Sequence, residues 1–231
     1  MLSLAACGQP QVEQGFDDPY EAQNRAVHEI NRSIDRAILR PASKGYSVIP
    51  EPVQRGIGNF ADNLDLPGSI VNDVLQANVD DAASNFTRFL INTTLGLGGV
   101  FDPATSFGLH ARDSDFGETL YVWGAAEGHY VELPLMGPST KRDAIGRIVD
   151  LFANPLGYIL PKPERYAIPL SGAASKVGDR YRLRGTIDSI LYDSADSYAQ
   201  LRLLYLENRR FELGNAPADD YFDPYEDPYA E

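Results

Sequence analysis

The residues best suited to chemistry are thinly spread along this sequence of 231 residues. Its three histidines, His28, His110 and His129, lie far apart and match no zinc-ligand spacing. The glycine run at residues 96–99 lacks the lysine and hydroxyl residue that complete a phosphate loop, and no Gly-x-Ser-x-Gly elbow occurs. We therefore expect that the protein is not an enzyme and that it binds no metal ion and no cofactor. A buried Ser/His/Asp cluster within hydrogen-bond reach would revive the enzyme hypothesis.

The single cysteine, Cys7, cannot form an internal disulfide, but its neighbours offer another chemistry. It ends the run Leu4-Ala5-Ala6-Cys7, which resembles a bacterial lipobox, where the thiol accepts acyl chains. Two acyl chains give stable membrane anchoring. A chance occurrence of this short motif is the alternative, and the polar, tether-like stretch 8–17 favours the lipobox. Since only a short stretch without a basic residue precedes Cys7, we expect the translated protein to begin upstream.

The charge of the chain excludes one class of partner and marks one terminal segment. The net charge is −13 and no strong Lys/Arg cluster occurs, so nucleic acid is a poor ligand. Six acidic residues and no basic residue lie in residues 219–231, a segment with two prolines and no apolar period. We expect residues 215–231 to form a disordered acidic tail that is dispensable for folding. The four aromatic residues of the tail could instead dock on a partner.

The remaining chain has the pattern of short amphipathic helices separated by prolines, with no stretch of about 20 apolar residues for a membrane span. One helix is expected to begin near Asp18 and to end at Pro41. Pro52 and Pro67 are each expected to open another helix. Further helical stripes lie at residues 79–94, 145–152 and 187–205. We expect the helix at 79–94 to be the longest amphipathic one.

The helix at residues 79–94 carries both an apolar stripe and two polar residues that share a face. Its apolar residues Phe86, Phe89, Leu90 and Ile91 are candidates for the wall of a ring or a lipid channel. Arg88 and Asn92 lie four residues apart and so face the same way. A solvated face and a contact with lipid headgroups are about equally expected for this pair. Non-local backbone hydrogen bonds would indicate a third, structural role.

Three blocks of sequence resemble the MlaA (VacJ) lipoprotein family. The blocks follow one another in the family's order over roughly residues 18–210, with a looser match from about residue 161. The first block is Asp18-Pro19-Tyr20-Glu21-Ala22-Gln23-Asn24-Arg25 with Ile30-Asn31; the second runs from Asn59-Phe60 through Phe86-Thr87-Arg88-Phe89 and Asn92-Thr93-Thr94 to Gly98-Gly99 and Asp102; the third runs from Asp115-Phe116-Gly117 through Leu133-Pro134 to Gly137-Pro138-Ser139 and Arg142-Asp143.

The resemblance implies a mainly α fold, a ring-like assembly of short amphipathic helices with a central channel and a small extended hairpin. The expected domains are a signal-peptide remnant at 1–7, a tether at 8–17, a helical transport domain at 18–214 and the tail at 215–231. The implied protein is anchored by lipid on the periplasmic side of the outer membrane. It would extract mislocalised phospholipid from the outer leaflet and pass it to a soluble periplasmic carrier, in association with a trimeric porin. The alternative is a lipoprotein scaffold or adaptor with a filled helical core.

The segment at residues 130–139 differs from the rest of the chain because it is extended and contains Pro134 and Pro138. Pro134 lacks a backbone donor and so excludes an interior strand of a sheet. A loop that fills a hole in the core and a gate over the implied channel are the two interpretations. The residues of the possible gate are Tyr130, Val131, Leu133, Leu135 and Met136.

Overall fold

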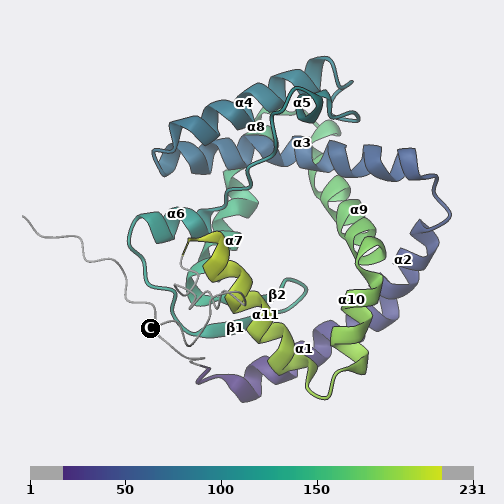
Figure 1. Ribbon diagram of the computed structural model, residues 1–231, viewed down its shortest axis with the longest axis vertical. Helices are drawn as coiled ribbons and strands as arrows, with labels where there is room; N and C mark the ends of the chain where they lie inside the picture. Colours follow the sequence, from purple (N-terminus) through teal and green to yellow (C-terminus); the bar gives the residue numbers. More distant parts are fainter. Residues whose placement is uncertain (1–17, 215–231) are drawn as a thin grey trace, which may run out of the picture.

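The helices of the protein follow one another around a ring (Figure 1). The computed structural model describes residues 18–214. Its first half contains α1 (Glu21–Ile34), the π-helix η1 (Asp35–Leu39), α2 (Arg40–Tyr46), α3 (Glu51–Leu75), α4 (Val79–Thr94), α5 (Pro103–Ser106) and α6 (Phe116–Val122). Its second half contains β1 (Tyr130–Leu133), β2 (Gly137–Thr140), α7 (Lys141–Ala153), α8 (Leu156–Ile159), the short 3-10 helix η2 (Glu164–Tyr166), α9 (Ala167–Arg182), α10 (Arg184–Asp188), the π-helix η3 (Ser189–Asp193) and α11 (Ser197–Glu212).

The first helical segment does not end at Pro41, contrary to the expectation from sequence. Helical backbone continues from α1 through η1 into α2 and ends at Tyr46. The π turn shifts the hydrogen bonding by one residue, so the backbone N–H of Arg40 donates to the carbonyl of Asp35. Pro41 then falls in the first turn of α2, where a missing N–H leaves no helical hydrogen bond unmade.

Pro67 lies inside α3 and does not open a new helix, so the expected break there is wrong as well. α3 is one helix of 25 residues and exceeds the 16 residues of α4, which was expected to be the longest. A proline inside a helix disturbs the hydrogen bonds of the preceding turn. Here the side-chain amide of Asn154 donates to the carbonyl of Leu64 at 2.7 Å, which supplies a partner at the disturbed turn.

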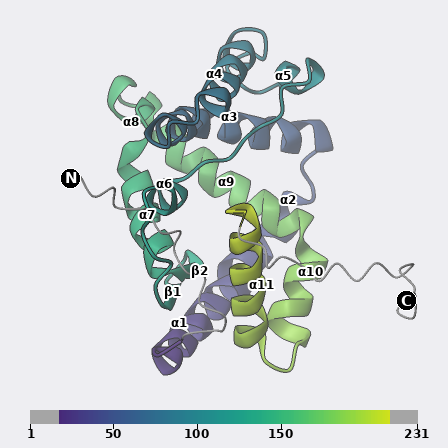
Figure 2. The ribbon, with the colours of Figure 1, turned by 60° about the vertical axis from the view of Figure 1, so that its left-hand side comes forward.

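The remaining elements close the ring. α4 packs along α3, and α9 packs against both α3 and α2 (Figure 1). The strands β1 and β2 form an antiparallel hairpin in which Tyr130 pairs with Thr140 and Leu133 with Gly137. α11 packs against η3 and β2, and its first residues lie next to α1, where Ser197 contacts His28 (Figure 2). The mainly α fold with a small hairpin, predicted from sequence, is confirmed.

Few large apolar side chains are buried in this ring. Tyr130, Tyr198 and Leu206 form a buried cluster with Tyr205 packed against it, where α11 meets the hairpin. Many other large apolar side chains of the described residues are exposed, while many asparagines, aspartates and arginines are buried. None of the helices in residues 18–214 is long and apolar enough to cross a membrane.

Candidate functional site

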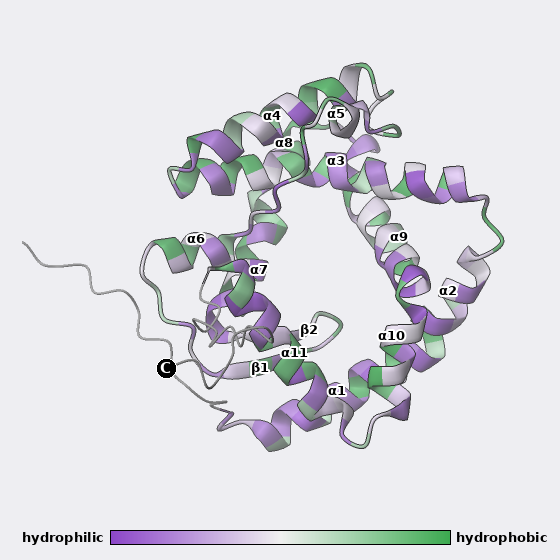
Figure 3. Cartoon of the chain, viewed as in Figure 1, coloured by the Kyte–Doolittle hydropathy of each residue, from purple (hydrophilic) through white to green (hydrophobic). Residues whose placement is uncertain are grey.

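On α4 the apolar side chains are exposed and the polar side chains are buried, which is the reverse of the usual arrangement for a protein in water. Phe86 is 52% exposed and Leu90 46% exposed, and Phe89 and Ile91 are half-buried. The buried residues of the same helix are all polar: Asn85, Arg88 and Asn92. The predicted wall residues therefore lie together on α4, as expected, but the face that packs against the protein is the polar one. Figure 3 shows apolar residues recurring around the ring, on α4, α7 and α11 among others.

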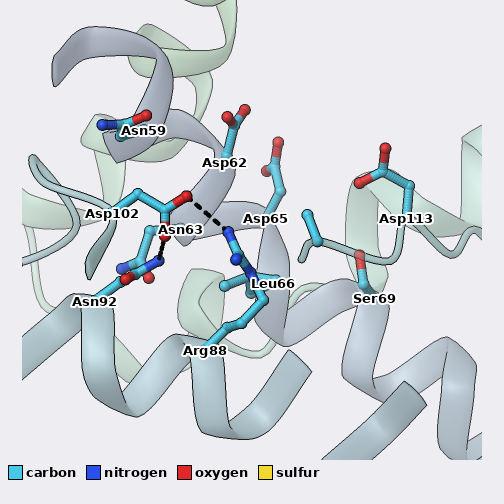
Figure 4. A pocket seen from close by; sticks show the side chains of 11 residues that line it. Asn59, Asp62, Asn63, Asp65, Leu66, Ser69, Arg88, Asn92, Asp102 and Asp113 are labelled. Atoms are coloured by element: carbon cyan, nitrogen blue, oxygen red, sulfur yellow. Dashed lines mark hydrogen bonds and ion pairs between the residues drawn. The ribbon is translucent and has the colours of Figure 1, made fainter. Parts of the chain in front are cut away.

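Arg88 and Asn92 have the third, structural role considered from sequence. The Arg88 guanidinium pairs with the carboxylate of Asp102 at 3.1 Å (Figure 4) and also donates to the Thr105 hydroxyl and the Leu109 carbonyl. Asn92 donates to Asp102 at 2.9 Å and accepts from the backbone N–H of Ala104 at 3.1 Å. The two side chains thus fasten the segment around α5 to α4, and the hydrogen bonds from Thr105, Asn92 and Arg88 lower the pKa of Asp102 against the effect of its burial.

α7 and α1 repeat this inversion. α7 buries Arg142, Asp143 and Gly146, while its apolar side chains Ile145, Ile148, Leu151 and Phe152 are exposed. α1 buries Asn24 and His28 and exposes Ile30. Apolar residues Ile30, Ile34, Ala37 and Ile38, together with Glu29 and Ser33, line a shallow hollow of about 410 Å³ along α1 and η1. An apolar exterior over a polar interior is the arrangement expected where the surroundings are acyl chains instead of water.

A small acidic pocket of about 230 Å³ lies between α3, α4 and the segment that follows α5 (Figure 4). Asp62, Asp65 and Asp113 stand on one side of it and point away from α4. Burial, together with repulsion from Asp62 and Asp113, raises the pKa of Asp65 to about 6. Burial and repulsion by Asp113 likewise raise the pKa of Asp62.

The hairpin is tied to α1 by two asparagines that hydrogen-bond to its backbone. Asn24 donates to the Tyr130 carbonyl at 3.2 Å and accepts from the Glu132 N–H at 2.9 Å. Asn31 donates to the Leu133 carbonyl at 2.9 Å and accepts from the Leu135 N–H at 2.8 Å. Each asparagine therefore acts like one residue of a neighbouring strand. Both residues belong to the first family block, but their role could not be predicted, since partners more than 100 residues away leave no local pattern.

The five residues of the expected gate divide into a buried or half-buried part and an exposed part. Tyr130 is buried, and Val131 and Leu133 are half-buried in β1. Leu135, with a positive φ of 65°, and Met136 are exposed in the turn. In the view of Figure 1 this turn lies inside the outline of the ring.

Comparison with known proteins agrees with this geometry. The family model described as MlaA lipoprotein matches residues 16–212. The chain belongs to the MlaA lipoprotein family. The protein named intermembrane phospholipid transport system lipoprotein MlaA of Escherichia coli K12 is 32% identical over 216 residues, which cover 91% of this chain and 83% of that protein. Its namesake from Haemophilus influenzae is 31% identical, over 86% of this chain and 80% of the relative.

Two further comparisons extend the family match. An uncharacterized protein of Rickettsia felis is 38% identical over 187 residues, which cover 80% of this chain and 73% of the relative. A solved structure described as "Structural basis for maintenance of bacterial outer membrane lipid asymmetry" has a TM-score of 0.69 and 30% identity, and the match covers 85% of this chain and 98% of that one. The resemblance to the MlaA family inferred from motifs is thereby confirmed.

A cluster of Ser197, His28 and Glu132 is the part of the described structure that bears on the enzyme hypothesis. Ser197 Oγ lies 2.9 Å from His28 Nε2, and His28 Nδ1 lies 3.5 Å from a carboxylate oxygen of Glu132. The criterion set from sequence is met only in part, because Ser197 and His28 are within hydrogen-bond reach whereas His28 Nδ1 makes no hydrogen bond to Glu132. All three side chains are buried, and the Tyr198 ring packs edge-on against His28. A substrate could reach Ser197 only if α1, β1 and α11 separated. We therefore interpret the cluster as a polar joint between these elements.

The structure bears on the possible metal ligands of the described residues, and it leaves the predictions for both chain ends untested. Within residues 18–214 no group of three or more histidine, cysteine, aspartate or glutamate side chains is arranged to hold a metal ion. Cys7, the remnant at 1–7, the tether at 8–17 and the tail at 215–231 lie outside the described residues.

Proposed function

We propose that the protein transports phospholipid as a lipid-anchored ring whose outer wall contacts acyl chains. The observation that carries the proposal is the inversion of polarity: Phe86 and Leu90 on α4, and Ile148 and Phe152 on α7, are exposed over buried polar faces. A scaffold with a filled core would bury these stripes. The names of the Escherichia coli and Haemophilus influenzae relatives, which refer to intermembrane phospholipid transport, support the same substrate.

The proposed route takes phospholipid that has strayed into the outer leaflet of the outer membrane and delivers it to a soluble periplasmic carrier. Acylation at Cys7 would hold the ring at the periplasmic side of that membrane. A trimeric porin is the proposed membrane partner. The lipid would pass through the ring in a channel with apolar and polar walls, so that acyl chains and headgroup are each solvated, and no covalent chemistry is needed.

The hairpin turn is the proposed gate of this channel. Asn24 and Asn31 hold β1 and the Leu135 N–H to α1, and Arg147 donates to the Met136 carbonyl, so opening of the gate would break the bonds of Leu135 and Met136 while β1 stays in place. A disulfide between a cysteine at Leu135 and one on α1, whose Asn31 accepts the Leu135 N–H, should lock the turn and block transport. The reduced form of the same variant is the control. Equal protection of the outer leaflet by the oxidised and reduced forms would make the segment a static plug.

The transport proposal is tested by measuring outer-leaflet phospholipid in cells that lack the protein. We expect the amount to rise, and to return to normal when the gene is restored. The variant Cys7→Ser should restore it poorly and should not incorporate labelled palmitate. An unchanged outer leaflet in cells without the protein would exclude the transport function and favour a scaffold.

A further inference from the structure

Four basic side chains meet in a pocket of about 330 Å³ where α2 faces the junction of α9 and α10. Arg40 and Lys44 come from α2, Arg180 from α9 and Arg184 from α10. The only carboxylate in the lining is Asp188, and Asp35 pairs with Arg180 from behind. Two carboxylates against four cations leave a local excess of positive charge in a chain whose net charge is −13.

Two arginines of this pocket, the buried Arg180 and the partly exposed Arg40, each have a buried nitrogen donor without a partner. Arg180 is only 4% exposed and forms a two-bond pair with Asp35 at 2.7 and 3.0 Å and a further bond to Asp188, yet its Nη1 has no hydrogen-bond partner. Arg40 pairs with Asp188 at 2.9 Å, and its buried Nε is also without a partner. A buried donor that is left unmatched costs free energy, so these nitrogens call for an acceptor. Lys44 and Arg184 at the mouth are exposed and complete the ring of charge.

The arrangement of these donors selects among anions. They approach from two opposite walls, α2 on one side and α9 and α10 on the other. A planar carboxylate is best held by the parallel donors of one arginine, as Asp35 is held here by Arg180, whereas the oxygens of a phosphate point in several directions. We propose that this pocket binds the phosphate group of a ligand, and that the ligand is a glycerophospholipid.

A groove on the side of α10 that faces α11, with a mainly apolar surface, favours a lipid over free phosphate as the source of that group. Arg184 and Asp188, four residues apart, belong to the basic pocket, while Gly185, Thr186 and Ser189 line a groove of about 640 Å³ between α10, η3 and α11. Its other wall carries Leu203 and Leu204, which are exposed. The volume of the basic pocket is at the lower end for a ligand site and suits a headgroup without its chains. The chains would lie in the groove.

The choice of lipid rests on the proposed function, whereas the phosphate site does not. Binding is therefore measured directly, by calorimetry at low salt on the full chain carrying Cys7→Ser, so that no attached acyl chain competes for the groove. The probes are inorganic phosphate, dihexanoyl phosphatidylglycerol below its micelle concentration, and dihexanoylglycerol, which has the same chains and no phosphate. We expect the phospholipid to bind more tightly than either of the other two.

Lys44→Ala combined with Arg184→Ala should weaken binding of both phosphate-containing probes by about tenfold or more, the effect of losing one charge-assisted hydrogen bond. Both residues are exposed and neither belongs to the Asp35–Arg180 pair, so the fold should be kept, as circular dichroism would check. The matched control is Lys176→Ala with Arg55→Ala, which removes the same charges from exposed positions on α9 and α3. Lys44→Gln alone should show a smaller loss.

Each outcome decides one part of the proposal. Equal affinity in the two double variants would overturn the phosphate site. Binding of inorganic phosphate without the phospholipid would keep the site and overturn the lipid as its ligand. If deletion of the protein raises outer-leaflet phospholipid but neither phosphate-containing probe binds, the site fails while the transport function stands. If both probes bind through Lys44 and Arg184 and deletion leaves the outer leaflet unchanged, the function fails and the site stands.

Discussion

The wall formed by α3 and α4 and the junction of α1, the hairpin and α11 are held together in different ways. The wall buries Arg88, Asn92 and Asn85 and leaves Phe86 and Leu90 exposed. The junction buries aromatic rings: Tyr130 and Tyr198 lie edge to face with centroids 5.9 Å apart. Apolar burial therefore contributes to the junction and much less to the buried face of α4.

The difference follows from what each region must face if the outer wall contacts lipid. Acyl chains are as apolar as leucine, so helices surrounded by them gain little from hiding apolar side chains. Polar pairs then supply the attraction between elements, and they are worth most when buried and fully matched. The junction lies where elements from both ends of the described chain meet, and there the burial of rings stabilises contacts in the usual way. Substitutions confined to one region at a time should therefore have different effects on stability.

The largest effect is expected for Arg88→Ala in the wall. The substitution leaves Asp102 without its cation and removes the hydrogen bonds to Thr105 and Leu109. Loss of one partner of a buried ion pair costs about 3–5 kcal/mol. Chemical denaturation should show this decrease in the free energy of unfolding. The control is Arg112→Ala, whose pair with Asp81 is exposed and should cost about 0–1 kcal/mol. Similar losses in the two variants would mean that the Arg88 network does not hold the wall.

A smaller effect is expected for Tyr130→Phe in the junction. The change keeps the ring and its contact with Tyr198 but removes the hydroxyl that donates to the Glu132 carboxylate at 2.5 Å. An unmatched buried acceptor costs about 1–3 kcal/mol. Tyr158→Phe, which removes a hydroxyl from an exposed ring, is the control and should change the unfolding free energy little. If Tyr130→Phe were as mild as the control, ring packing alone would account for the junction.

Some elements of the wall and of the junction could be predicted from the sequence, because interactions between residues close together in the chain determine them. The bounds of α4 follow from Asn78, which caps the helix by accepting from the N–H of Asp81, and from the apolar period that follows. The hairpin follows from the prolines and glycine at residues 134–138. Both rest on interactions within a few residues, which a sequence pattern records. The mainly α fold could be predicted for the same reason.

The errors and omissions come from interactions between distant residues. Pro41 and Pro67 are ordinary helix-breaking signals, and only the π turn before Pro41 and the amide of Asn154 near Leu64 let helices continue past them. The burial of Arg88 depends on Asp102 and Leu109, which follow α4. A periodic stripe gives the two faces of a helix but not which face packs inward, so the inversion of α4 could not be read from its period. The basic pocket joins α2 to α9 and α10 and was missed because its residues lie more than 130 positions apart.

The acidic pocket beside the wall should give a pH dependence of modest size. The pKa of Asp65 is about 6 in the folded protein, above its usual value, chiefly because of burial. The folded state then binds more protons than the unfolded state between about pH 4 and pH 6, so this residue lowers stability as pH rises through that window. Asp65→Asn should raise the melting temperature at pH 7 and leave it nearly unchanged at pH 4. Asp80→Asn, on α4 but outside the acidic pocket, is the control. Parallel curves for Asp65→Asn and the parent protein would contradict the raised pKa.

The smallest effect on folding is expected for Phe86→Ser combined with Leu90→Ser, on the exposed face of the wall. Surface substitutions usually change the unfolding free energy by no more than about 0.5 kcal/mol each, and here no buried partner is lost. Association with vesicles should respond far more, because burying two half-exposed apolar side chains in lipid is worth about 2 kcal/mol, or roughly thirtyfold in affinity. Flotation with phospholipid vesicles measures this in the Cys7→Ser background, which removes the anchor. Thr87→Ser with Thr93→Ser, also exposed on α4, is the matched control. A double serine variant that unfolded easily in water would mean that this face packs against protein. A stable variant that no longer floats would separate two roles of α4. Its polar face would then hold the ring together, and its apolar face would hold the ring in the membrane.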